Sequence, residues 1–504
     1  MKNWHGGRMF SKRITLAFFA ALILCGCQTT LKSHMNKLGE KDYHTQSAKI
    51  PKICQQGVEF ACYLNGKSFP NYSYRRLSVL QGPGTETTAQ FNFLVPPMER
   101  ELKIYIHPKN QPLIGFWVTK ITTENVANSD YDIQHFFIEH LQPKIDYKML
   151  FVNSSGEIVD QRQFQTSELS KKFANLLTVS GLREELYTQQ QQYWSVVKKF
   201  NIDAIFLIGN VVMADELHYQ PQKHANKNLL WQRYLESRLR LPLYYMENLI
   251  PVVANWNEHD YGKVNGDQNY KHRLLARRVF KTFFPQKAIN IAFIEGPGNS
   301  YLWNGFSQQF FFMDNRTFRT KNNKYTKFQY QWGREQLRFL QDNIKTSSLI
   351  INGGPVFLNY RPSESFLRNQ PYGLKNAMQT LRSTNKKFAF ITGGNSLTEV
   401  ARVPKVWLGY DSIELNVSGL IEQLEKDYWQ RYPNDLQLAG IVGQHHFLLV
   451  QSKAEENNIR LHVVAKDLNE NKLMNQIFNA PYPPQNKPLQ GPRRALSNTP
   501  ELSN

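Results

Sequence analysis

The pattern of apolar residues changes once along this chain, near Thr166, and this change constrains the fold more than any other feature. Before it, apolar and polar residues alternate in short runs, among them QFNFLV (90–95), ELKIYIHP (101–108), LIGFWVTKI (113–121) and YKMLFVN (147–153). A two-residue period is typical of half-buried strands, and a series of short strands separated by turns indicates an antiparallel sandwich. We therefore predict an immunoglobulin-like β-sandwich domain over residues 51–167.

After Thr166, apolar strands alternate with stretches whose apolar residues recur at helical spacing. The expected strands are 173–181, 202–210, 249–256, 289–296, 308–314, 347–354 and 387–394, and the expected helices include 186–200, 228–240 and 333–345. Buried strands alternating with amphipathic helices predict a layered α/β domain, here over residues 168–475. The final segment, 476–504, is rich in Pro, Asn and Gln and is predicted to be a disordered tail.

The N-terminus has the parts of an export signal. Positive residues precede the apolar run Ile14–Leu24, which is shorter than the roughly 20 residues needed to span a bilayer. The run ends in Leu24-Cys25-Gly26-Cys27, which resembles the lipobox of bacterial lipoproteins. We predict a signal peptide over 1–26, a lipid on Cys27 and a tether over 27–50. An ordinary cleaved signal and a short uncleaved anchor remain the alternatives.

The predicted location is the bacterial cell envelope. Gln28, in place of an aspartate after the lipidated cysteine, resembles lipoproteins sorted to the outer membrane. Cys54 and Cys62 are then free to form a disulfide in an oxidising compartment, with two unpaired buried thiols as the alternative. So few thiols argue against a cysteine-based zinc site.

The chain is strongly basic, with 61 Lys and Arg against 41 Asp and Glu and a formal net charge of +20. Such a surface attracts polyanions, which in an envelope include anionic polymers and lipid head groups. No sequence motif of a nucleic-acid-binding domain accompanies the charge, so a specific nucleic-acid partner is not expected. A solvated basic surface without a dedicated ligand is the simpler interpretation.

Six segments, taken in order, resemble the alkaline phosphatase D (PhoD-like) family over about 147–465. They are RQFQT (162–166), GNVVMADE (209–216), PVVANWNEHDYG (251–262), MDNRTFR (313–319), WGREQLRFLQDNI (332–344) and TGGNSLTE (392–399). The resemblance implies a secreted metal-dependent phosphoesterase, in which an immunoglobulin-like domain precedes a metallophosphoesterase-like α/β sandwich domain.

The metal-ligand positions depart from that family. The resemblance implies an iron and calcium centre held by a cysteine, an aspartate and a tyrosine early in the domain, and by an aspartate and a histidine late. At those positions this chain has Gly181, Asn210, Met213, Gly394 and Ser396. Hard cations need anionic oxygen donors, and an amide, a thioether and a glycine cannot replace them. Losing several ligands also removes the Lewis acid that phosphoryl transfer requires.

Our leading hypothesis is therefore a catalytically defective, PhoD-like envelope lipoprotein that serves as a binding or structural module, with no cofactor expected. Its partners would be the membrane, through the lipid, and an anionic envelope polymer or another protein. A second hypothesis is an active phosphatase or phosphodiesterase that holds a divalent cation, or iron and calcium, with Asp215, Glu216, His259 and Asp260. His259, Asp260 and Arg316 would then be the catalytic candidates. A third is a basic surface lipoprotein that binds polyanions without using the cleft.

Overall fold

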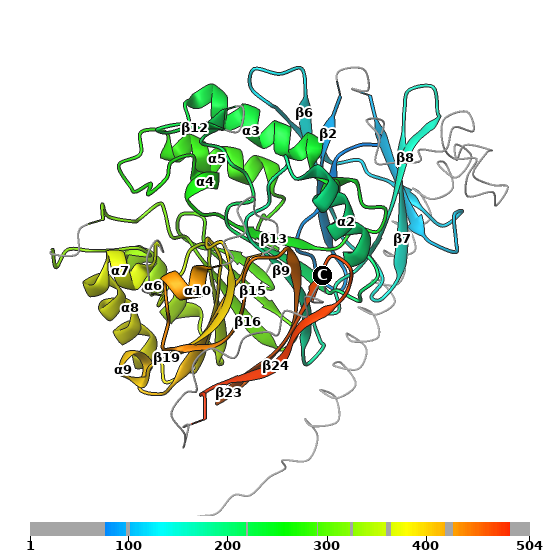
Figure 1. Ribbon diagram of the computed structural model, residues 1–504. Coiled ribbons are helices and arrows are strands. Elements are labelled where there is room, and N and C mark those ends of the chain that lie inside the picture. The colour runs from blue at the N-terminus through cyan, green and yellow to red at the C-terminus, as the bar shows by residue number, and fades with distance from the viewer. Residues whose placement is uncertain are drawn as a thin grey trace, which may run out of the picture.

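The computed structural model describes residues 76–96, 101–217, 220–289, 291–322, 326–358, 364–418 and 427–483. The predicted signal peptide, Cys27, the tether, and Cys54 and Cys62 all lie outside the described residues. Within the described ranges, the helices are too short or too polar to cross a membrane. The fold is mixed α/β with several sheets, as the sequence predicts (Figure 1).

The N-terminal part consists of two four-stranded antiparallel sheets. One has the order β1-β2-β6-β5 and the other β4-β3-β7-β8. Their strands are β1 (Val79–Gln81), β2 (Ala89–Val95), β3 (Lys103–Pro108), β4 (Phe116–Trp117), β5 (Ile121–Asn125), β6 (Asp132–Ile138), β7 (Asp146–Val152) and β8 (Ile158–Gln165). Alternate residues from both sheets, such as Phe93 and Phe151, form a shared core.

One strand expected in this region is much shorter than predicted. Residues 113–121 contain only the two-residue strand β4 and the first residue of β5. The preceding backbone turns tightly against Tyr105, whose hydroxyl donates to the Pro112 carbonyl at 3.0 Å. A Cβ at Gly115 would lie 2.4 Å from that hydroxyl, so the glycine permits this turn.

The first sheet of the larger domain has the order β13-β10-β9-β22-β23-β24. Its strands are β9 (Ala174–Val179), β10 (Ala204–Ile208), β13 (Val252–Asn255), β22 (His446–Glu455), β23 (Asn458–Asp467) and β24 (Lys472–Ala480). The three early strands are parallel, and the three late ones are antiparallel.

The predicted start of the tail at residue 476 is too early. Strand β24 pairs with β23 as far as Ala480, and its alternate residues Met474 and Phe478 are buried between the sheets. The polar residues that suggested a tail, Asn475 and Gln476, lie on the exposed part of the same strand.

The second sheet has the order β14-β15-β16-β17-β18-β20-β19-β21. Its strands are β14 (Phe293–Glu295), β15 (Tyr301–Gly305), β16 (Gln308–Met313), β17 (Ser348–Asn352), β18 (Phe388–Thr392), β19 (Thr398–Val403), β20 (Ser412–Asn416) and β21 (Gln437–Ile441). The central strands β16, β17 and β18 are parallel. A separate two-stranded antiparallel sheet is formed by β11 (Glu216–Leu217) and β12 (Gln220–Pro221).

The two large sheets face each other, and helices cover their outer faces. Phe206 of β10 and Phe312 of β16 lie in the core between the sheets, 5.0 Å apart by ring centroid. Their neighbours Leu207 and Phe311 point outward into helix-covered cores. The helices are α2 (Tyr187–Val197), α3 (Lys227–Arg240), α4 (Glu258–Tyr261), α5 (Arg273–Phe283), α6 (Gly333–Asn343), α7 (Phe366–Asn369), α8 (Pro371–Ser383), α9 (Lys405–Leu408) and α10 (Tyr428–Arg431), with a 3-10 helix at Pro242–Tyr245.

Candidate functional site

The carboxyl ends of the parallel strands from both sheets meet at one place. A Cβ at Gly209, after β10, would lie 2.6 Å from the Asn257 Cβ and 2.8 Å from the Gly353 carbonyl oxygen. A Cβ at Gly393, after β18, would lie 2.5 Å from Ser180 Oγ. Loops at strand ends are where α/β folds carry ligand sites, so this junction is the candidate site.

Ser180 connects two of these loops. Its hydroxyl donates to the Gly209 carbonyl at 3.1 Å and accepts from the Gly394 amide at 3.0 Å. Gly181 donates its amide to the same Gly209 carbonyl at 3.2 Å. Three positions that the family resemblance assigns to metal ligands, Gly181, Asn210 and Gly394, therefore lie on loops that join at this point.

The other two positions that the family resemblance assigns to metal ligands, Met213 and Ser396, lie in different surroundings. Met213 is buried, and its carbonyl accepts from Arg233 Nε at 3.1 Å, so this segment is fixed against α3. Ser396 lies half-buried in the loop between β18 and β19.

Asp260 is buried and organises the loop after β10. Its carboxylate accepts hydrogen bonds from the backbone amides of Asn210, Val211 and Val212 at 2.5, 2.8 and 2.8 Å, and from Asn257 at 2.8 Å. Burial raises the pKa of Asp260 to about 6, although the four amides oppose the shift. Both of its oxygens are engaged by the backbone, so this residue holds the loop in place.

His259 forms an ion pair with Asp215, with 2.7 Å between Nδ1 and Oδ1. Burial disfavours the charged ring, but the hydrogen bond and charge of Asp215 outweigh it and raise the pKa of His259 to about 9. The ion pair thus favours the imidazolium form, and a metal ion would have to displace a proton in order to bind this ring. Glu216 instead pairs with Arg183 through two hydrogen bonds of 3.1 and 3.0 Å.

These residues do not fit the metal centre that the fold family implies. The structure brings Asp215 and His259 together, whereas Glu216 and Asp260 have other partners. Within the described ranges, His, Cys, Asp and Glu side chains form no group of three or more that could hold a metal ion.

Asn257 fills the space between the strand ends. It lies 2.9 Å from the side-chain amide of Asn315, and its Oδ1 accepts a short hydrogen bond from Arg316. Its Nδ2 faces Gly394, where a Cβ would approach to 2.6 Å. Arg316 is 1 % exposed, so this contact is shielded from water.

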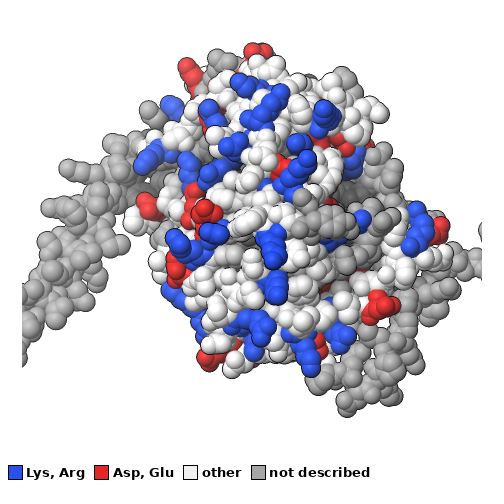
Figure 2. All heavy atoms as spheres, turned by 90° about the vertical axis from the view of Figure 1, so that its left-hand side faces the viewer, with Lys and Arg blue, Asp and Glu red and all other residues white. Residues whose placement is uncertain are grey.

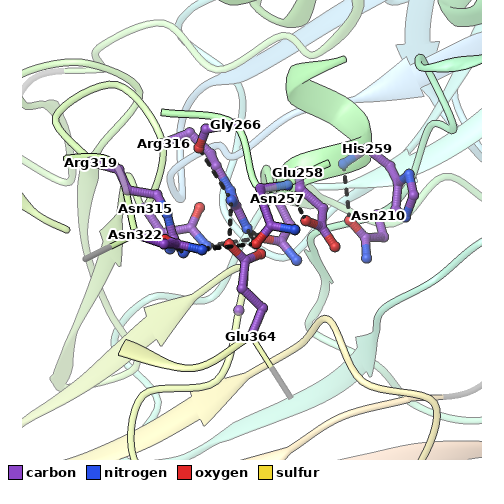
Figure 3. Close-up of polar contacts among 12 residues, drawn as sticks. Asn210, Asn257, Glu258, His259, Gly266, Asn315, Arg316, Arg319, Asn322 and Glu364 are labelled. Atoms are coloured by element: carbon purple, nitrogen blue, oxygen red, sulfur yellow. Dashed lines mark hydrogen bonds and ion pairs between the residues drawn. The ribbon is translucent and has the colours of Figure 1, made fainter. Parts of the chain in front are cut away.

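Arg316 and Arg319 both converge on Glu364 (Figure 3). Arg316 Nη2 donates to Glu364 Oε2 at 2.9 Å, and Arg319 makes a short ion pair with the other oxygen. Burial opposes ionisation, but the two guanidinium groups hold the pKa of Glu364 below its usual value. Glu258 lies against Glu364, and burial together with that negative charge raises the pKa of Glu258.

The sequence reasoning missed Glu364 and the filling role of Asn257. Glu364 is distant in sequence from the Arg316 segment, and no local pattern connects the two. Asn257 lies within one of the six matching segments, but its close approach to Gly394 depends on the packing of two sheets.

The sheets, their covering helices and the loops at the strand ends define a mixed α/β class of fold. The structure is similar to a solved structure described as PhoD, with a TM-score of 0.58 and 12 % identity over 81 % of this chain and 94 % of that chain. At this identity the likeness establishes a PhoD-like fold.

A second similarity is slight. The sensor domain of the anti-sigma factor RsgI4 from Pseudobacteroides cellulosolvens matches with a TM-score of 0.14 and 15 % identity, over 18 % of this chain and 88 % of that domain. No protein-family model and no curated protein sequence matches this chain.

Proposed function

We propose that this chain is an envelope lipoprotein of the PhoD-like family that has lost the metal centre and serves as a binding or structural module. Its two-sheet N-terminal part would be the family's immunoglobulin-like domain. The proposal also includes a signal peptide, a lipid on Cys27, sorting to the outer membrane and a Cys54–Cys62 disulfide. Only the amino-acid sequence supports these features.

The contact between Asn257 and Gly394 carries the proposal. Where the family resemblance places a metal-ligating aspartate, this chain has a glycine that Asn257 approaches closely. Arg316, a cation, lies within hydrogen-bonding distance of Asn257. Its guanidinium already occupies the side-chain oxygen of Asn257, so that oxygen is not free to ligate a metal ion.

The remaining donors support the same conclusion. Asn210 offers a neutral amide, and its Oδ1 is 3.4 Å from the His259 amide. Asp260 already accepts hydrogen bonds from backbone amides, and one oxygen of Asp215 is paired with the His259 ring. A calcium or ferric ion would have to displace these partners to find anionic ligands.

The Asp215–His259 pair favours one alternative, an active phosphoesterase with a rearranged metal site. A cation that displaced the proton from His259 could use that ring together with Asp215, whose Oδ2 is buried and without a partner in the described part of the chain. Because Glu216 and Asp260 are engaged elsewhere, this alternative requires the loops to rearrange.

Metal content and turnover test the proposal. The purified full-length protein is incubated with iron and calcium, dialysed and analysed for bound metal, then assayed with an aryl phosphate and a bis-aryl phosphodiester. We expect less than stoichiometric metal and no turnover above buffer. Stoichiometric metal, with turnover abolished by His259→Ala but retained in His462→Ala on strand β23, would establish the alternative.

A further inference from the structure

A group of basic residues surrounds the place where the segments before α3 and α5 meet. We call it the α3–α5 basic patch, and it consists of Lys223, His224, Lys227, Lys271, His272 and Arg273. The rings of His224 and His272 lie 6.4 Å apart by centroid, which brings the two segments together. Burial and then the charges of Lys271, His224 and Lys227 lower the pKa of His272, as a local positive potential requires.

The positive charge of this patch is not neutralised. Lys223, Lys227, Lys271 and Arg273 are exposed, and none makes an ion pair within the residues that the structure describes. Residues 220–235 contain no acidic residue, and residues 261–275 contain only Asp267, which is 8 % exposed. An approaching anion would therefore find few negative side chains to repel it.

Helix stability does not explain these charges. Lys227 and Arg273 are the first residues of α3 and α5, and the first turns of both helices lack acidic residues. The helix dipole disfavours a cation at this end by about 0.3–1 kcal/mol. The placement costs helix stability, which favours a role for these charges in binding an external partner.

An exposed leucine lies within the patch. Leu274 follows Arg273 directly and is 71 % exposed. Basic side chains around a protruding apolar residue are typical of surfaces that bind anionic membranes, because the cations contact the head groups and the apolar group enters the boundary region. Figure 2 shows the side of the molecule at the left of Figure 1, where Lys and Arg outnumber Asp and Glu.

We propose that the α3–α5 basic patch docks onto an anionic phospholipid surface. The chain between Cys27 and Arg76 has 49 residue steps, which span at most about 170 Å when fully extended. A lipid on Cys27 would therefore leave the patch within reach of the same membrane and raise its effective concentration there. The inference rests on the proposed function only for this tethering of the patch to the membrane through the lipid on Cys27.

Vesicle binding of the full chain tests the patch separately from the lipid. The protein carries Cys27→Ser to prevent acylation, and its affinity is measured by co-sedimentation with phosphatidylcholine vesicles with and without phosphatidylglycerol. The neutral vesicles report any contribution of the apolar segment 14–24. We expect binding that requires the anionic lipid and weakens with salt, since exposed charges are screened.

Charge-reversal variants locate the surface. Lys271→Glu with Arg273→Glu should weaken binding at least about 25-fold, since each basic residue near an anionic surface contributes about 5-fold. The matched control, Lys345→Glu with Lys375→Glu, changes the net charge equally at exposed positions near α6 and α8 and should change binding less than about 3-fold. Thermal unfolding of each variant verifies that it is folded.

Replacement of the exposed leucine distinguishes binding to a membrane from binding to a soluble anionic polymer. Leu274→Ser should weaken vesicle binding about 3- to 10-fold, whereas Val406→Ser on α9, equally 71 % exposed, should have little effect. Equal losses in the two charge-reversal pairs would overturn the proposal. So would an inert Leu274→Ser together with release from vesicles by soluble polyphosphate, because the patch would then bind polymeric anions. Whether Cys27 is acylated is read independently from the mass of the N-terminal peptide.

Discussion

The close approach of Gly394 to Asn257 can be measured as a free energy of unfolding. Gly394 has φ +84°, and a Cβ there would lie 2.6 Å from Asn257 Nδ2 and 3.1 Å from the Gly353 carbonyl oxygen. Gly409, in the same domain, has the same φ of +84°, but its Cβ would meet only Arg382, at 3.8 Å. Alanine at each glycine therefore imposes the same backbone strain, while only Gly394→Ala displaces a neighbour.

The expected magnitudes follow from these geometries. An alanine in a left-handed conformation costs about 1–2 kcal/mol, and we expect Gly409→Ala to lose that amount. At Gly394, Asn257 must also move and weaken its hydrogen bond with Arg316, which costs a further 2–3 kcal/mol or so. We therefore expect Gly394→Ala to be less stable than Gly409→Ala by at least about 2 kcal/mol.

The free energy of unfolding of both variants is measured by urea denaturation followed by circular dichroism. Equal m-values show that the same unfolding transition is compared. Adding Asn257→Ala should recover part of the Gly394→Ala loss, because the displaced side chain is then absent, and a double-mutant cycle gives this coupling. Equal destabilisation by the two alanines, with no coupling to Asn257, would refute the close approach. It would also show that no steric obstacle prevents the introduction of an aspartate at 394.

Three further outcomes follow from buried charges. Asp260→Asn should cost about 3–5 kcal/mol in urea unfolding, because an amide cannot accept from four backbone amides; a loss below 1 kcal/mol would contradict its role. Glu364→Gln should cost about 3–5 kcal/mol by leaving two buried arginines uncompensated, whereas exposed Glu335→Gln should be nearly neutral in the same assay. Burial lowers the pKa of His446 from 6.5, its value in an unfolded chain, to about 4. Because the unfolded state then takes up a proton more readily than the folded state, the free energy of unfolding is full above about pH 6.5 and decreases as the pH falls toward 4. The wild type should lose about 3 kcal/mol more than His446→Gln between pH 7 and pH 4, and parallel pH profiles would exclude this.

Much of the element order can be predicted from the sequence. The strands at 202–210, 308–314 and 387–394 are confirmed because short apolar runs there are buried on both faces. The helix at 228–240 is confirmed within one residue, because Asn226 accepts from the Leu229 amide and fixes its start.

Other boundaries depended on contacts that no local pattern contains. The start of β22 is one of these boundaries: the chain turns at Gly443, with φ +75°, and the strand begins only at His446. The turn is needed because the residues on its two sides pair with different strands. Ile441 pairs with Thr398 of β19, whereas His446 pairs with Asp467 of β23.

The sequence by itself determined the alternation of strands and helices, and the residue types at the positions that the family resemblance assigns to metal ligands, because periodicity and donor chemistry are local properties of the chain. Only the tertiary structure decided what surrounds those residues. The contact of Asn257 with Gly394, the pairing of Arg316 and Arg319 with Glu364, and the approach of His224 to His272 each join residues far apart in sequence. Such contacts depend on how the two sheets and their covering helices pack, and packing is a property of the whole domain.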